Sequence, residues 1–284
     1  MDTYEVIAVR YASRRTLRSQ VYLNHHVYGE PDAPIGMDYY FWVLRNDART
    51  IVVDTGYSNV GGHNRQRGHI IHPSLALNRL DVHPREALVI LTHAHYDHAG
   101  NLDLFPESEV VVPRREYEFW TGPFAQRPMY HHSIEDDDIG EMRRIHDEDR
   151  MRFAPIDGVV APGVRMIELG GHSPGQAVLL VDTNDGPVLL ASDATHYYEE
   201  LDREMPFLVV DNLAAMYAGF DTMKAIIDEH DAILVPGHDP AVFERHEPVN
   251  AELADIAVRI GHPTTPPALL LPASATTPES RQTR

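Results

Sequence analysis

The sequence contains no cysteine, and it has a single lysine, Lys224, among 284 residues. The absence of cysteine excludes a thiol nucleophile, a disulfide and a thiolate ligand for a metal. Lys224 lies in the amphipathic stretch 214–229, where the polar side of a helix is expected to face solvent. Schiff-base chemistry is therefore not expected of this chain.

Basic residues are few, and long apolar runs are missing. The chain has 24 Lys and Arg against 43 Asp and Glu, a formal net charge of −19. Nucleic-acid binding normally needs a basic stripe, and none is found, so no nucleic-acid partner is expected. No apolar run reaches membrane-spanning length, and residues 1–5 have neither the basic region nor the apolar segment of a signal peptide. We therefore expect a cytoplasmic protein with no membrane partner.

The remaining composition favours one globular domain. With 43% hydrophobic residues, the chain can bury one large core. Residues 1–262 are predicted to form a single hydrolase domain, and the proline-rich and threonine-rich segment 263–284 a flexible tail. Strands are expected over 4–11, 39–45, 50–53, 110–112, 164–169, 177–182 and 188–191. Helices are expected over 114–120, 214–229 and 251–260, with long irregular segments over 57–83 and after 123.

One short segment is unusually rich in metal-binding side chains. Three histidines and an aspartate stand within six residues, directly after the apolar run 87–91: His93, His95, Asp97 and His98. A buried strand that ends in a tight turn can aim imidazoles and a carboxylate at one point, which suits Zn²⁺ and similar ions. A polar loop with many histidines is the alternative interpretation. Four ligands at this spacing favour the metal site.

Three further residues occupy the same kind of place, a turn just after an apolar strand. They are His172, Asp193 and His238. Singly, each is a weak signal, because Asp193 could cap a helix and His238 could be a turn residue. Their order and placement resemble the metallo-β-lactamase superfamily, in which a His-x-His-x-Asp-His motif is followed by a distant His, a bridging Asp and a last His. The resemblance covers about residues 35–245.

The resemblance implies a fold and a set of ligands. The fold class is α/β, a four-layer αββα sandwich with metals at one edge between the sheets. Two divalent cations are implied, Zn²⁺ first, with Mn²⁺, Co²⁺ or Fe²⁺ as alternatives. One cation would be bound by His93, His95 and His172, the other by Asp97, His98 and His238, with Asp193 between them. Asp54 matches an earlier family motif whose aspartate supports a ligand histidine.

Within the superfamily, the sequence is most similar to the N-acyl homoserine lactonase group, through residues 192–198, 204–207 and 235–239 as well as the ligands. The similarity implies a lactonase, in which a hydroxide bridging the metals attacks the lactone carbonyl and Asp97 passes a proton to the leaving oxygen. Those lactonases commonly have a tyrosine three residues after the bridging aspartate. This chain has His196 there. Either His196 or the neighbouring Tyr197 is predicted to contact the substrate carbonyl.

Three aromatic residues, Tyr96, Phe119 and Trp120, are the predicted wall of the substrate pocket. The substrate is expected to be a small lactone or ester, and the oligomeric state is left open, with a dimer as one option. The same metal pair could instead hydrolyse another ester, a thioester as in glyoxalase II, or a ring amide. A glutathione thioester needs cationic side chains, which this chain is expected to lack. A metal-binding or sensing protein without catalysis is the second alternative, although it would not need all seven ligands.

Overall fold

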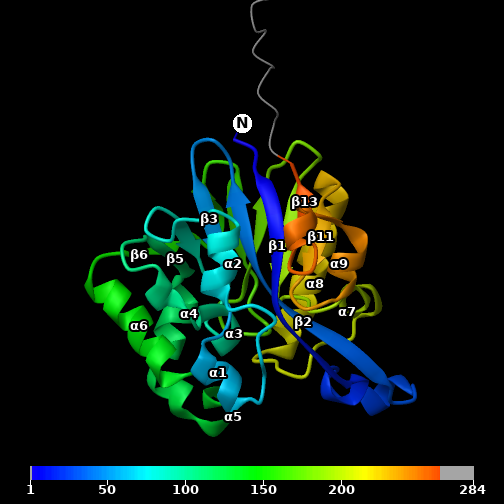
Figure 1. Ribbon diagram of the computed structural model, residues 1–284. Coiled ribbons are helices and arrows are strands. Elements are labelled where there is room, and N and C mark those ends of the chain that lie inside the picture. Colours follow the sequence, from blue (N-terminus) through cyan, green and yellow to red (C-terminus); the bar gives the residue numbers. More distant parts are fainter. Residues whose placement is uncertain (1, 263–284) are drawn as a thin grey trace, which may run out of the picture.

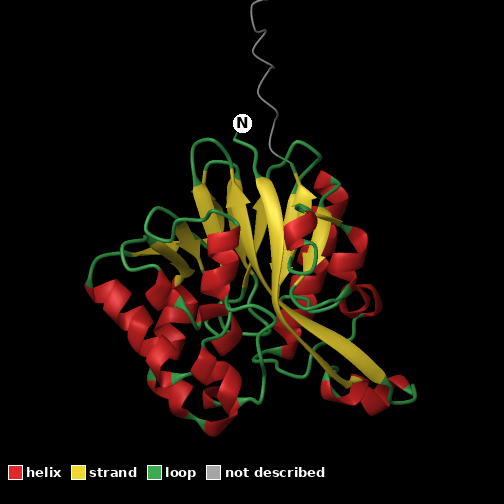
Figure 2. Ribbon diagram, viewed as in Figure 1, coloured by secondary structure: helices red, strands yellow, loops and turns green. Residues whose placement is uncertain are grey.

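The computed structural model describes residues 2–262. The predicted tail, residues 263–284, lies outside the described residues. Two β-sheets pack face to face and helices cover their outer sides (Figures 1 and 2). The predicted four-layer αββα sandwich is therefore confirmed.

The larger sheet has eight strands in the order β12-β13-β1-β2-β3-β4-β5-β6. From β12 to β3 neighbouring strands are antiparallel, whereas β3, β4, β5 and β6 are parallel. Parallel neighbours need crossover connections, and these contain the helices on this side of the molecule. The strands are β1 (Glu5–Leu17), β2 (Pro34–Arg45), β3 (Thr50–Val53), β4 (Leu88–Ile90), β5 (Val110–Pro113), β6 (Met151–Ala154), β12 (Glu247–Pro248) and β13 (Ala257–Gly261).

The smaller sheet has five strands in the order β11-β10-β9-β8-β7. Only β10 and β11 are parallel, and their connection contains the longest helix, α8. The other neighbours are antiparallel hairpin partners. The strands are β7 (Asp157–Ala161), β8 (Val164–Glu168), β9 (Ala177–Val181), β10 (Val188–Ser192) and β11 (Ile233–Pro236).

The helices form two groups on opposite sides of the sheets (Figure 1). Beside the larger sheet lie α1 (Asn59–Asn64), α2 (Pro73–Arg79), α3 (Tyr96–Ala99), α4 (Arg114–Trp120), α5 (Pro128–His131) and α6 (Asp136–Asp147). On the other side lie α7 (Tyr198–Arg203), α8 (Leu213–His230) and α9 (Ala241–Arg245). Short 3₁₀ helices are η1 (Arg18–Gln20), η2 (His25–Tyr28), η3 (Leu102–Leu104), η4 (Pro123–Gln126) and η5 (Ala251–Leu253). No helix in residues 2–262 combines the length and apolar character needed to cross a membrane.

Three apolar layers stabilise this arrangement. Side chains alternate between the two faces of a strand, so in β1 Val6 lies between the sheets while Ile7 lies in the layer under the helices. The third layer lies between the smaller sheet and α8, where Met216, Phe220 and Met223 share one helical face. Both faces of the central strands are therefore buried.

Several predicted elements differ from the structure. The predicted helix over 251–260 is wrong, because only Ala251–Leu253 is helical and Ala257–Gly261 is strand β13. Pairing of Val258 with Ala8 of β1 extends the larger sheet there. The predicted loop 57–83 contains α1 and α2, and the irregular segment after 123 contains α6. The predictions over 114–120 and 214–229 correspond to α4 and α8.

The hairpin of β1 and β2 extends beyond the body of the sheets (Figure 2). Its tip contacts α7, because Arg18 forms an ion pair with Glu199 at 2.6 Å and the Tyr22 hydroxyl donates to the same carboxylate. These contacts place the residues of the hairpin beside the edge of the sheets where the candidate site lies.

The buried side chain of Asp138 in α6 should make the stability of the fold depend on pH. Its Oδ2 is buried and meets no hydrogen-bond donor from residues 2–262. Burial, with Glu135 and Asp137 nearby, raises the pKa of Asp138 to about 8. The unfolded chain releases this proton near pH ~4, so stability should fall as the pH rises from there to about 8. Asp138→Asn should therefore raise the melting temperature at pH 8 and change it little at pH 5.

Asp147, at the other end of the same helix and exposed, provides the matched control, since Asp147→Asn removes a carboxylate from α6 without changing the charges around Asp138. Thermal unfolding followed by circular dichroism at both pH values measures the effect. A melting temperature of Asp138→Asn at pH 8 no higher than that of the wild type would contradict the interpretation.

Candidate metal centre and active site

The candidate site lies where strands of both sheets end. In the larger sheet, β3 is followed by Asp54 and β4 by the segment 93–98. In the smaller sheet, β10 is followed by Asp193, β11 by His238, and β8 by the loop of His172. The predicted ligands therefore meet at one edge of the sandwich.

Four predicted ligands form one group of polar atoms. The ligand atoms of His93, His95, His172 and Asp193 all lie within 4.8 Å of one another. His95 Nδ1 is 2.8 Å from His172 Nε2, which is 3.3 Å from Asp193 Oδ2. His93 Nε2 is 3.7 Å from that same oxygen.

The other three predicted ligands, Asp97, His98 and His238, form a second group within the same 4.8 Å limit. Asp193 also faces this group, but through its other oxygen. Its Oδ1 lies 3.3 Å from His98 Nε2 and 3.1 Å from His238 Nε2. The carboxylate of Asp193 thus presents one oxygen to each group.

The chemistry of these atoms fits two divalent cations. Buried polar atoms nearly always have a hydrogen-bond partner, so those without one need an explanation. Imidazole nitrogens and carboxylate oxygens are the usual ligands of Zn²⁺. Within residues 2–262, the buried atoms that lack a partner include His93 Nε2, His98 Nε2, His238 Nε2 and Asp193 Oδ1.

The outer nitrogen of three of these imidazoles is held by the surrounding protein. Such a contact fixes the ring and leaves the inner nitrogen free for a metal. The three contacts are His98 Nδ1 with Asp54 Oδ2 at 2.8 Å, His172 Nδ1 with the Val209 carbonyl at 2.9 Å, and His238 Nδ1 with the Asp38 carbonyl at 2.7 Å.

Asp54 connects three of the converging strands. It accepts from the Thr92 amide and hydroxyl, each at 2.8 Å, and from the Ser192 hydroxyl at 3.3 Å. Both Asp54 and Ser192 have positive φ, 60° and 46°, which is costly for residues other than glycine. The backbone is therefore strained at the ends of β3 and β10, next to the contact between Asp54 and the ligand His98.

Burial determines the protonation of the first group. It lowers the pKa of three imidazoles, those of His93, His95 and His172, the last to about 3. These rings are therefore neutral, which is the form that binds a metal. Burial alone would raise the pKa of Asp193, but the neighbouring histidines outweigh it and lower that pKa.

His196 and Tyr197, the alternative substrate contacts, occupy different environments. His196 is buried against the cluster, with Nε2 3.1 Å from Asp193 Oδ2 and Nδ1 3.2 Å from Glu200 Oε2. The carboxylates of Asp193 and Glu200 outweigh burial and raise its pKa to about 9. The Tyr197 hydroxyl instead donates to the Gly36 carbonyl at 2.9 Å. Of the two, only His196 lines the cavity described next.

A cavity of about 770 Å³ lies over the cluster. Tyr96 and His196 line it, together with three arginines, Arg14, Arg65 and Arg67. The arginines correct the expectation that the chain lacks cationic side chains for an anionic substrate. Sequence reasoning missed them because they come from the hairpin and from the segment after α1, far from the ligand motif.

A second cavity of about 310 Å³ shares His95 and His172 with the first. Its wall includes Trp120, Met129 and Leu208. The predicted pocket residues are therefore divided, with Tyr96 in the first cavity and Trp120 in the second. Phe119 lines neither, because its ring packs on Trp120, Phe124 and Tyr130.

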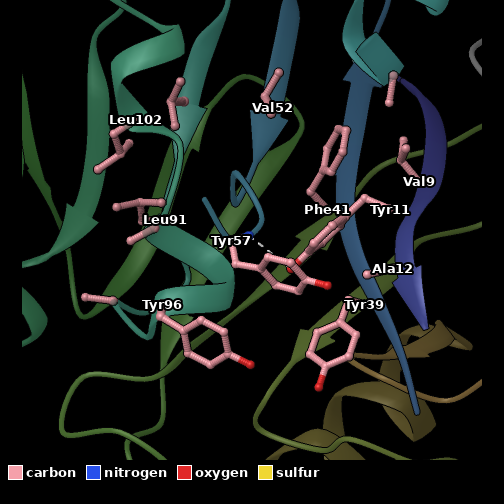
Figure 3. Packing of buried hydrophobic residues seen from close by; sticks show 14 of the residues in the cluster. Val9, Tyr11, Ala12, Tyr39, Phe41, Val52, Tyr57, Leu91, Tyr96 and Leu102 are labelled. Atoms are coloured by element: carbon pink, nitrogen blue, oxygen red, sulfur yellow. Dashed lines mark hydrogen bonds between the residues drawn. The ribbon is translucent and has the colours of Figure 1, made fainter. Parts of the chain in front are cut away.

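A group of tyrosines supports the ligand turn from the side of the larger sheet (Figure 3). Tyr57 contacts Tyr39 and Tyr96, with ring centroids 5.5 and 5.9 Å apart. The Tyr11 hydroxyl donates to the Asp97 carbonyl at 2.9 Å and accepts from the Tyr57 amide at 3.2 Å. The backbone of Asp97 is therefore anchored to β1.

Glu116 of α4 is a further supporting residue that sequence reasoning missed. It is fully buried, and burial raises its pKa. Its Oε2 accepts from the Ala94 amide at 3.0 Å and the Trp120 indole at 2.6 Å. Its Oε1 accepts from the Ser173 hydroxyl at 2.5 Å and the Gly175 amide at 2.6 Å. One carboxylate thus joins the turn between His93 and His95 to the loop of His172.

The chain matches one protein-family model and several known proteins. The model of the metallo-beta-lactamase superfamily matches residues 37–238. An N-acyl homoserine lactonase of Bacillus cereus is 27% identical over 228 residues, covering 74% of this chain and 84% of that protein. The N-acyl homoserine lactonase AttM of Rhizobium radiobacter is 27% identical over 164 residues, covering 54% of this chain and 57% of that protein.

Solved structures show the same fold at lower identity. An N-acyl homoserine lactone hydrolase with the product N-hexanoyl-L-homoserine at its catalytic metal center has a TM-score of 0.72 at 21% identity, covering 86% of this chain and 97% of that one. The dizinc quorum-quenching lactonase AidC has a TM-score of 0.65 at 14% identity, covering 84% and 91%.

Glu116 can be tested as a positioning residue. Glu116→Gln keeps the size of the side chain, but an amide has only one oxygen to accept four donors, so the two ligand loops should separate. Loss of such supporting contacts commonly weakens metal binding by about 10- to 100-fold. Competition with a chelator, followed by elemental analysis, should show this loss. Glu118→Gln, in the same helix but exposed, is the control. Equal metal retention in both variants would contradict the role.

Proposed function

The chain belongs to the metallo-β-lactamase superfamily, and from this premise we propose that it is a dinuclear metal-dependent hydrolase that opens a lactone ring. The observation that carries the proposal is the position of Asp193, whose two oxygens face two separate groups of ligands. Its curated relatives are N-acyl homoserine lactonases, which favours lactones over other substrates of the same chemistry.

We assign one cation to His93 Nε2, His95 Nδ1 and His172 Nε2, and the second to Asp97, His98 Nε2 and His238 Nε2. Asp193 lies between them, and Asp54 orients His98 through the contact at 2.8 Å. Imidazole and carboxylate ligands suit Zn²⁺, and Mn²⁺, Co²⁺ or Fe²⁺ remain alternatives. Two such cations supply a water of lowered pKa and polarise a carbonyl oxygen.

The side chains of this chain would then position the substrate and move a proton. Asp97, itself one of the second group of ligands, lines the cavity, where its carboxylate can carry a proton to the leaving ring oxygen. Either His196 or Tyr197 was predicted to contact the substrate carbonyl. We assign this contact to His196, because it lines the same cavity. The Tyr197 hydroxyl is occupied by Gly36, so we assign it no contact with substrate.

The second cavity suits an apolar part of the substrate. Trp120, Met129 and Leu208 give it an apolar wall, and it meets the metal centre at His95 and His172. Tyr96 lines the first cavity. Another ester, a thioester or a ring amide could use the same metal pair. The cytoplasmic location and the oligomeric state stay predictions.

A comparison of substrates tests the proposal. With one metal-loaded preparation, kcat/KM should be higher for lactones, whether acyl homoserine lactones or simple γ- and δ-lactones, than for S-lactoylglutathione. Release of a proton, followed with a pH indicator, reports hydrolysis of every substrate. If the thioester is the best substrate, the lactonase proposal fails; if no substrate is hydrolysed, a binding or sensing role gains support.

Asp97→Asn should lower the rate by at least ~10²-fold without loss of the fold.

A further inference from the structure

Two arginines in the wall of the main cavity have no carboxylate partner within residues 2–262. Arg14 of β1 contacts Met37 Sδ through Nε at 3.4 Å, and Arg67 donates to the Tyr96 hydroxyl. The Nε of Arg67 is buried without a hydrogen-bond partner in this part of the chain. With 43 acidic residues against 24 basic ones, carboxylates are plentiful. These two cations are therefore free to bind something else.

Both arginines lie close to the metal centre, around Tyr39. The Arg67 guanidinium carbon is 5.5 Å from the centre of the Tyr39 ring, and the Tyr39 hydroxyl is 3.7 Å from the same Met37 sulfur that Arg14 contacts. The Tyr39 ring in turn lies 5.1 Å from the ring of His238. Burial raises the pKa of Tyr39 to about 12, and the charges of Arg67 and Arg14 oppose that rise. One aromatic ring thus separates the two cations from a ligand histidine.

The carboxylates that line the same cavity are engaged elsewhere or exposed. Glu135 pairs with Arg65, and Asp136 lies 3.1 Å from His131. Asp137 is exposed to solvent. The remaining two, Asp97 and Asp193, belong to the metal cluster. The wall therefore offers Arg14 and Arg67 no acidic partner of their own.

We propose that Arg14 and Arg67 bind a carboxylate of the substrate while the metal centre holds its scissile carbonyl. The inference rests on the proposed function and narrows it to lactones that carry a carboxylate. A guanidinium group binds a carboxylate through short, charge-assisted hydrogen bonds, and partial burial strengthens them. A neutral acyl homoserine lactone offers this part of the wall only an amide oxygen.

The γ-lactone of 2-hydroxyglutaric acid is a suitable probe, because its free carboxylate sits on the carbon that bears the ring oxygen. Hydrolysis breaks the bond between the acyl carbon and the ring oxygen. Water supplies the new acyl oxygen, the ring oxygen becomes a hydroxyl group, and the acyl carbon becomes a second carboxylate. One proton is released, as for any lactone at neutral pH.

The first experiment compares this lactone with its carboxamide on the metal-loaded enzyme. The acid should have the higher kcat/KM, by about tenfold or more, because a hydrogen-bonded charge is lost in the amide. Arg14→Gln and Arg67→Gln should each reduce that preference toward one. Arg15→Gln is the matched control, since Arg15 is the next residue of β1 and is exposed. A preference that survives in both cavity variants overturns the inference.

A binding experiment separates this inference from the proposed function. Glutarate and its monoamide each offer one carboxylate to the metal centre and differ only at the other end. Calorimetry on the metal-loaded protein should show glutarate binding about tenfold more tightly in the wild type and in Arg15→Gln, but not in the two cavity variants. Equal binding in the wild type overturns the inference even if lactones are hydrolysed. Preferential binding without lactone hydrolysis keeps the anion site and refutes the lactonase.

Discussion

The carboxylate of Asp193, shared between two groups of imidazoles, is the contact on which the rest of the site depends. A buried carboxylate and buried imidazoles lose their hydration, and without partners they destabilise the fold. Several of their atoms have no hydrogen-bond partner within residues 2–262. Bound metal ions would supply the missing partners, so metal binding would be coupled to the stability of this edge of the sandwich. The same atoms would then serve both the fold and the proposed chemistry.

The fold keeps the carboxylate of Asp193 between the two groups because the turns that follow its strands are tightly packed. At Gly237 a Cβ atom would lie 2.6 Å from Asp193 Oδ1, so any side chain would displace the shared carboxylate. At Gly171, where φ is +92°, a Cβ atom would lie 2.7 Å from the Met216 backbone. Asp54 and Glu116 join turns from different strands through buried hydrogen bonds. Rigid surroundings of this kind hold the ligands in the geometry that a metal pair needs.

Local patterns predicted the parts of the molecule that depend on local sequence. The ligand turn 93–98 is compact enough to indicate a metal site by itself, whereas the distant ligands His172, Asp193 and His238 are weak signals singly and were assigned through the resemblance to the metallo-β-lactamase superfamily. Glu116, Arg14 and Arg67 could not, because their partners lie far away in the sequence and nothing in their own segments marks them. Residues 257–260 were predicted as part of a helix over 251–260, yet pairing with β1 makes them strand, which shows tertiary contacts overriding local preference. The segment after 123 was predicted as irregular, yet the exposed Asp136 and Asp137 begin α6 there, where negative charge is favourable at a helix N-terminus.

The metal content of the purified protein tests the central claim most directly. Elemental analysis after expression with added metal, combined with anomalous diffraction from crystals, counts the ions and places them. The account predicts two ions per chain, about 3.5–4 Å apart, with the carboxylate of Asp193 between them. A protein that stays free of metal under these conditions, or that saturates at one ion with Asp193 turned away, would contradict it.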